Sequence, residues 1–123
     1  MKNHVVQTTY RVVEAYHRSN DDPIVLHRGD PVKVGREFTD DPGWPGWIWC
    51  ENTAGQGGWV PKRLLKIMGS HGTALADYTA RELSIQPEER LMVDKILNGW
   101  AFARRLDGDT GWVPMRNLQP QST

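Results

Sequence analysis

Hydrophobic and polar residues alternate over short stretches of this chain, in the pattern typical of β-strands. Val32-Lys33-Val34 follows a period of two, and short aromatic or β-branched segments are separated by Gly57-Gly58 and by Asp107-Gly108, which we interpret as turns. No stretch carries a long apolar period of 3.6 residues, so we expect no helix beyond a single turn after Pro61 and after Pro114. The chain is therefore predicted to be all-β.

The sequence also contains an internal repeat, whose matching blocks occur in the same order in both copies. The blocks are Val12–Tyr16 with Ala74–Tyr78, Leu26–Asp30 with Ile85–Glu89, Trp47–Cys50 with Trp100–Ala103, and Gly57–Leu65 with Thr110–Leu118. We therefore predict two consecutive domains, residues 5–67 and residues 73–120, joined by the short Gly-rich linker Met68–Gly72. Several short strands in about 50 to 60 residues imply a small closed barrel for each copy, because closure removes exposed sheet edges.

Strand alternation assigns residues to the inside and outside of these barrels. Outward-facing Trp47 and Trp49 would place Ile48 and Cys50 inside, and outward-facing Trp100 and Phe102 would place Ala101 and Ala103 inside. Cys50 is then a buried small residue rather than a reactive thiol. The remaining core positions predicted by the pattern are Val12, Ile24, Leu26, Val34, Val60 and Leu65 in the first copy, and Ala74, Leu83, Ile85, Val93, Val113 and Leu118 in the second.

These blocks carry a family resemblance. Ala74-Leu75-Ala76-Asp77-Tyr78, followed by Asn98-Gly99-Trp100 and Gly111-Trp112-Val113-Pro114, resembles the Src-homology-3 (SH3) domain. The first copy is similar but more divergent, and its Trp44–Cys50 segment resembles bacterial tandem SH3-like proteins. The resemblance implies two five-stranded SH3-like barrels in tandem, whose usual work is binding proline-rich peptides and not catalysis.

The resemblance also implies where a peptide would bind. A proline-rich segment in its extended left-handed helix packs between aromatic rings, and an acidic loop pairs with a flanking Arg or Lys. In the first copy the groove positions are Glu14, Tyr16, Trp47, Pro61 and Leu64, with Asp21 and Asp22 in the loop; in the second they are Ala76, Tyr78, Trp100, Pro114 and Asn117. Two rings are missing from each groove. The first loop of the second copy, Thr79–Glu82, is shorter and keeps one acid, so we expect the first copy to be the main binding site.

Two further features allow alternatives. The first copy carries an inserted loop, residues 39–46, in which Trp44 either joins Trp47 to replace the missing rings or packs on its own barrel. Trp49 and Phe102 either pack one barrel against the other or lie along a neighbouring strand of their own barrel.

Composition narrows the function classes. The 123 residues carry 15 Lys and Arg against 15 Asp and Glu, which argues against a partner held by unpaired positive charge, such as nucleic acid or an anionic membrane. The one cysteine and four scattered histidines show no metal-ligand spacing, and we predict no cofactor, no metal and no catalytic residues. Arg104 and Arg105 are expected to be solvated. No secretory signal is visible, so a cytoplasmic location is expected.

We therefore expect a non-catalytic interaction module that binds an extended proline-containing or basic segment of a partner protein, mainly through the first barrel. Two alternatives stay open: an SH3-like protein that binds the bacterial cell wall, and a structural subunit with no peptide ligand.

Overall fold

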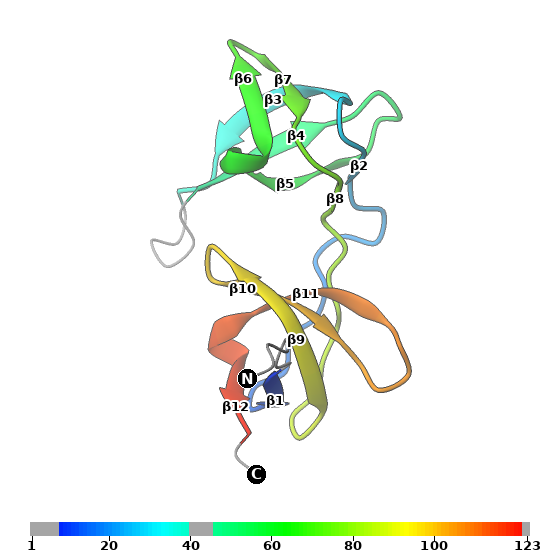
Figure 1. The fold of residues 1–123 in the computed structure, drawn as a ribbon, viewed down its shortest axis with the longest axis vertical. Helices are drawn as coiled ribbons and strands as arrows, with labels where there is room; N and C mark the ends of the chain where they lie inside the picture. Colours follow the sequence, from blue (N-terminus) through cyan, green and yellow to red (C-terminus); the bar gives the residue numbers. More distant parts are fainter. Residues whose placement is uncertain (1–7, 40–45, 122–123) are drawn as a thin grey trace, which may run out of the picture. The chain divides into compact units, whose positions relative to one another are not determined.

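The computed structural model describes residues 8–39 and 46–121, whose regular structure consists of short strands and two 3-10 turns (Figure 1). The strands are β1 (Thr8–Val12), β2 (Val25–Leu26), β3 (Pro31–Glu37), β4 (Trp47–Glu51), β5 (Gly57–Pro61), β6 (Leu65–Met68), β7 (His71–Ala74), β8 (Tyr78–Thr79), β9 (Arg90–Leu97), β10 (Trp100–Arg104), β11 (Thr110–Pro114) and β12 (Leu118–Pro120). Single 3-10 turns follow the two prolines, η1 at Lys62–Leu64 and η2 at Met115–Asn117, as predicted. Within these described ranges no helix is long and apolar enough to span a membrane.

One five-stranded sheet has the order β11-β10-β9-β1-β12. The N-terminal strand β1 is an inner strand of this sheet, antiparallel to both of its neighbours, with Tyr10 opposite Leu91 of β9 and opposite Pro120 of β12. In Figure 1 the dark blue β1 accordingly lies beside the red β12. The first strand of the chain therefore completes a sheet whose other four strands come from residues 90–120.

The second five-stranded sheet has the order β5-β4-β3-β7-β6. Here β7, the first strand of the second sequence repeat, lies between β3 and β6 of the first repeat, with Gly72 opposite both Val32 and Ile67. The short strands β2 and β8 pair with each other, Leu26 opposite Tyr78. The two repeats have thus exchanged their first strands.

As a result, the compact units are not the consecutive domains 5–67 and 73–120 that the repeat predicts. One unit is continuous, Ser19–Arg81; the other is split and consists, in its described part, of residues 8–18 and 82–121. We call them the continuous unit and the split unit. In chain order, the continuous unit is inserted into the loop that follows β1 of the split unit, so the backbone passes between the units twice, after Arg18 and after Arg81.

The joint between the repeats explains the exchange. The segment predicted as the flexible linker Met68–Gly72 is a β-hairpin, with β6 and β7 joined by Gly69 and Ser70 alone. Gly69 has a φ of 64°, a left-handed conformation that favours glycine. Two residues reach at most about 7 Å, enough to turn between adjacent antiparallel strands. Because the joint is so short, β7 pairs with the strand that precedes it and leaves its place in the other sheet to β1.

Most predicted core residues are buried, including Cys50, Ala101 and Ala103. The exception is Val34, which is half-buried; the register of β3 against β4 shifts just after it, and Val32 of the same strand is buried. Val12 was predicted to lie in the core of the first copy. Because of the strand exchange it packs in the core of the split unit, among residues of the second copy. The residues of that core are Tyr10, Val12, Leu83, Ile85, Leu91, Val93, Ala101, Ala103, Val113 and Leu118.

The two predicted turn dipeptides have different outcomes. Asp107-Gly108 lies in the turn between β10 and β11, where Gly108 has a φ of 97°. Gly57-Gly58 is instead part of β5, and glycine is needed there for close packing. A Cβ on Gly57 would lie 2.5 Å from the Trp49 ring, and one on Gly58 would lie 2.7 Å from the Ile24 side chain.

Candidate functional site

The strand exchange redistributes the predicted groove residues between the units. Tyr16 belongs to the split unit, where it contacts Trp100 with ring centroids 5.6 Å apart and planes at 82°, whereas Trp47 of its own repeat belongs to the continuous unit. Both rings are half-buried, so each keeps a surface toward solvent. The two perpendicular rings form a corner, and each ring comes from a different sequence repeat.

Tyr16 is held by both its backbone and its hydroxyl group. Its backbone N–H and C=O exchange hydrogen bonds with Ile85, 3.0 and 2.8 Å long. Its hydroxyl donates to a carboxylate oxygen of Glu82 at 2.8 Å. Glu82 is the single acid of the shortened first loop of the second copy, and this hydrogen bond places it beside Tyr16.

Asn117 occupies a position where the family resemblance implies an aromatic ring, and in this structure its side chain forms hydrogen bonds to the backbone. The residue is 5% exposed, and its side-chain amide nitrogen donates to the carbonyl oxygens of Glu14 and Ala15, both at 3.1 Å. These carbonyls directly precede Tyr16, so Asn117 fixes the exchanged segment where it enters the ring pair. Its burial and its donor role were not predicted from the sequence, where Asn117 was noted only as a missing ring.

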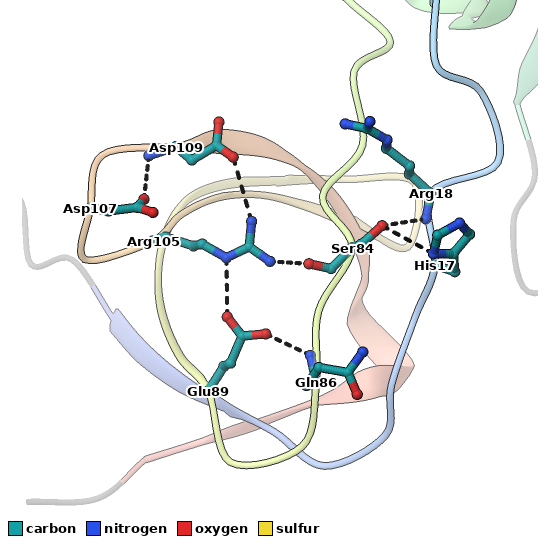
Figure 2. Close-up of polar contacts among 8 residues, drawn as sticks. All are labelled: His17, Arg18, Ser84, Gln86, Glu89, Arg105, Asp107 and Asp109. Atoms are coloured by element: carbon teal, nitrogen blue, oxygen red, sulfur yellow. Dashed lines mark hydrogen bonds and ion pairs between the residues drawn. The ribbon is translucent and has the colours of Figure 1, made fainter.

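Arg105 fixes the other segment, the one that returns from the continuous unit (Figure 2). Its guanidinium donates to Glu89 at 3.0 Å, to the backbone carbonyl oxygen of Ser84, and to Asp109 at 3.5 Å. Ser84 in turn accepts a hydrogen bond through its hydroxyl oxygen from the backbone N–H of Arg18, 2.9 Å away. Arg105 is therefore not the solvated residue that was expected: its side chain is 24% exposed and ties both crossing segments to the split unit.

Pro61 and Pro114 lie opposite Trp47 and Trp100 in the strand register, as the groove prediction requires. Both prolines, however, are less than 2% exposed. They support the tryptophans from the neighbouring strand and offer no surface to a ligand, which corrects their assignment as contact residues.

The continuous unit holds the remaining predicted ring residues in a more closed arrangement. Trp47 is 6% exposed and Tyr78 is 8% exposed, which contradicts the outward orientation expected for Trp47. Trp47 begins β4 beside the end of β3, where its carbonyl oxygen accepts from Phe38, and the Tyr78 hydroxyl donates to the carbonyl oxygen of Trp59 at 2.8 Å. Leu64, in η1, is half-buried. These side chains pack within the continuous unit and leave little ring surface for a peptide.

Asp21 and Asp22 are exposed in the continuous unit, in the segment that follows the first crossing. Asp22 accepts a hydrogen bond from the side chain of Gln56 at 2.9 Å, which links this segment to the turn between β4 and β5. Both acids therefore belong to the continuous unit, whereas Tyr16 belongs to the split unit. Trp44, the other predicted contact residue, lies outside the described residues.

The outward aromatic residues pack on neighbours in their own units. Trp49, 37% exposed, meets Trp59 edge to face at 5.2 Å, and Phe102 meets Trp112 in the same way at 5.1 Å. This is the second of the two arrangements considered above, with each ring lying along a neighbouring strand. Packing of one barrel against the other through these rings stays a prediction.

Burial raises the pKa of the Cys50 thiol to about 11, so at neutral pH the residue is a protonated, unreactive part of the core. Among the described residues no three or more His, Cys, Asp or Glu side chains gather into a group that could hold a metal ion.

A comparison with protein families matches residues 9–68 to the variant SH3 domain. SH3 domains generally mediate protein–protein interactions and are typically non-catalytic. The two five-stranded sheets are consistent with SH3-like barrels. The matched segment begins in β1 and ends with β6, so it follows the first sequence repeat and contains residues of both compact units. No curated protein matches the sequence.

Proposed function

We propose that this chain is a non-catalytic interaction module that binds an extended proline-containing or basic segment of a partner protein through the split unit. The observation that carries the proposal is the corner formed by Tyr16 and Trp100, with Glu82 hydrogen-bonded to the tyrosine hydroxyl. Half-exposed aromatic rings offer flat apolar surface to the ridges of an extended proline-rich segment. The Glu82 carboxylate beside the tyrosine supplies a negative charge that can attract an Arg or Lys of the ligand.

The proposal moves the main site away from the first repeat. The continuous unit buries Trp47 and Tyr78, whereas the equivalent residues of the split unit, Trp100 and Tyr16, are only half-buried. A shallow corner of two rings and one acid is expected to bind with modest affinity, in roughly the micromolar range.

The test is an isothermal titration calorimetry measurement with a twelve-residue peptide that has a polyproline core and an Arg at one end. Trp100→Ala is expected to weaken binding at least about tenfold, because it removes one wall of the corner. Trp47→Ala, the matched change in the continuous unit, should lower thermal stability and leave the affinity of the folded protein unchanged. A peptide with Asp in place of Arg should bind more weakly, because Glu82 would repel its negative charge.

The proposal fails if Trp100→Ala binds the peptide as tightly as the unchanged protein. Binding lost with Trp47 and not with Trp100 would return the site to the continuous unit. An interaction with purified peptidoglycan that survives both substitutions would favour the cell-wall alternative.

A further inference from the structure

The two units differ in how the chain builds them, and this difference sets a direction of dependence between them. All strands of the continuous unit come from one stretch, Ser19–Arg81. The split unit is assembled from residues 8–18 and 82–121, and the whole continuous unit lies between these two pieces in the sequence. The fold of the split unit therefore closes a loop that contains the other unit.

When the continuous unit is folded, this loop is effectively short. The backbone N–H of Ala80 donates to the carbonyl oxygen of Ile24 at 3.0 Å, and Val25 pairs with Thr79. The two ends of the continuous unit are thereby held side by side, and only residues 19–23 and 81 remain as connections. The ends enter the split unit already close together.

When the continuous unit is unfolded, residues 19–81 become one flexible loop. The entropy cost of closing a loop rises with the logarithm of its length. This loop is about ten times as long as the short connections, which corresponds to roughly a thirtyfold weaker closure. The cost falls on the contacts beside the crossings, namely Tyr16 with Ile85, Tyr16 with Glu82, and Arg18 with Ser84. These are the contacts that hold Tyr16 against Trp100.

The reverse situation carries no such cost. If the split unit unfolds, the continuous unit only has loose chain at its two ends, and none of its own strands has to close over an inserted segment. We infer that the stability of the split unit, and with it the Tyr16–Trp100 corner, depends on the continuous unit being folded, whereas the continuous unit is stable whether or not the split unit is folded. This dependence follows from chain connectivity and goes beyond the proposed peptide binding, since it exists without any ligand.

The experiment unfolds each unit separately in the full-length chain. Val60 and Val113 are repeat-equivalent and fully buried, as are Leu26 and Ile85. Replacing two such residues with aspartate puts unpaired carboxylates in an apolar core, which such a small unit does not tolerate. The continuous unit is unfolded by Val60→Asp with Leu26→Asp, and the split unit by Val113→Asp with Ile85→Asp.

Two readouts follow the units independently. Labelling of Cys50, the one cysteine of the chain, reports opening of the continuous unit because the thiol is fully buried there. Hydrogen exchange of the amides in β9 and β10 reports the split unit. In the variant with an unfolded continuous unit, Cys50 should label at once and protection in β9 and β10 should fall at least roughly thirtyfold. In the reciprocal variant, Cys50 should stay as protected as in the unchanged chain.

Two results overturn the inference. One is unchanged protection of β9 and β10 while Cys50 labels freely, which would show that the split unit does not need its insert folded. The other is rapid Cys50 labelling when only the split unit carries the substitutions, which would show a mutual dependence and one cooperative fold.

Discussion

The continuous unit and the split unit are built from equivalent sequence blocks, but they use their aromatic residues differently. In the continuous unit Trp47 and Tyr78 are buried, and the Tyr78 hydroxyl is bonded to a backbone carbonyl of the same unit. In the split unit Tyr16 and Trp100 are half-exposed, and the Tyr16 hydroxyl is bonded to a carboxylate. The same ring types at equivalent positions therefore serve packing in one unit and form a candidate binding surface in the other.

The largest difference between the units is expected when each is produced as a separate fragment. A fragment of residues 19–81 contains every strand of its sheet and is expected to fold alone, with dispersed amide signals in a nitrogen–proton correlation spectrum. A fragment of residues 82–121 lacks β1, which lies between β9 and β12, and is expected to be unfolded. Dispersed signals from the second fragment, or their loss from the first, would contradict the division into these units.

The next largest effect is expected from the two cores. Leu26→Ala in the continuous unit and Ile85→Ala in the split unit each remove a large, fully buried side chain and should cost on the order of 2–5 kcal/mol of unfolding free energy. Denaturant unfolding followed by hydrogen exchange would locate the cost. Each substitution is expected to act first on its own unit; equal deprotection of both units by Ile85→Ala would argue against separate cores.

Asn117 and Leu64 offer a smaller and more specific comparison, because they occupy equivalent positions after the two prolines. Asn117→Leu removes the donor for the carbonyl oxygens of Glu14 and Ala15 and should cost about 1–3 kcal/mol, since these groups lose their partner. Urea unfolding measures the cost, and hydrogen exchange of residues 8–18 should rise more than that of β10 and β11. The reciprocal change Leu64→Asn is the control, and it should leave the exchange of residues 8–18 unaffected.

Cys50 gives the smallest effect at neutral pH and sharpens the comparison because the split unit has no counterpart thiol. Its pKa in the folded chain, about 11, lies above the ordinary value of 9.0 because of burial. The stability that this shift contributes is complete below about pH 9 and is lost as the pH rises from about 9 to 11, where the unfolded chain gives up its proton first. Unfolding midpoints measured across that range should fall for the unchanged chain and fall less for Cys50→Ala. An identical pH dependence in both proteins would mean that the thiol titrates normally.

Much of the local structure could be predicted from the sequence, because it depends on neighbouring residues. Alternation placed Cys50, Ala101 and Ala103 in the core, and the two prolines marked the 3-10 turns. The repeat located the equivalent strands in each copy. These signals depend on periodicity and backbone geometry, which a single segment carries by itself.

The partner of each strand could not be predicted in this way. The alternation in β1 shows which face is apolar but does not show which sheet that face joins, and both repeats offer an equivalent place. This uncertainty in strand pairing had its largest effect on the site. The sequence groups Tyr16 with Trp47, whereas in the structure Tyr16 contacts Trp100. Gly57 and Gly58 were interpreted as a turn because glycine is common in turns, whereas here they make room for Trp49 and Ile24.

The two-residue turn at Gly69 and Ser70 has a consequence for the gene as well as for the fold. A deletion of everything after the turn would remove β7 and β8 from the continuous unit, and a deletion of everything before it would remove β1 from the split unit. Each half of the coding sequence therefore specifies parts of both units. In the arrangement seen here neither copy by itself supplies all the strands of one five-stranded sheet, so each sheet requires residues from both copies.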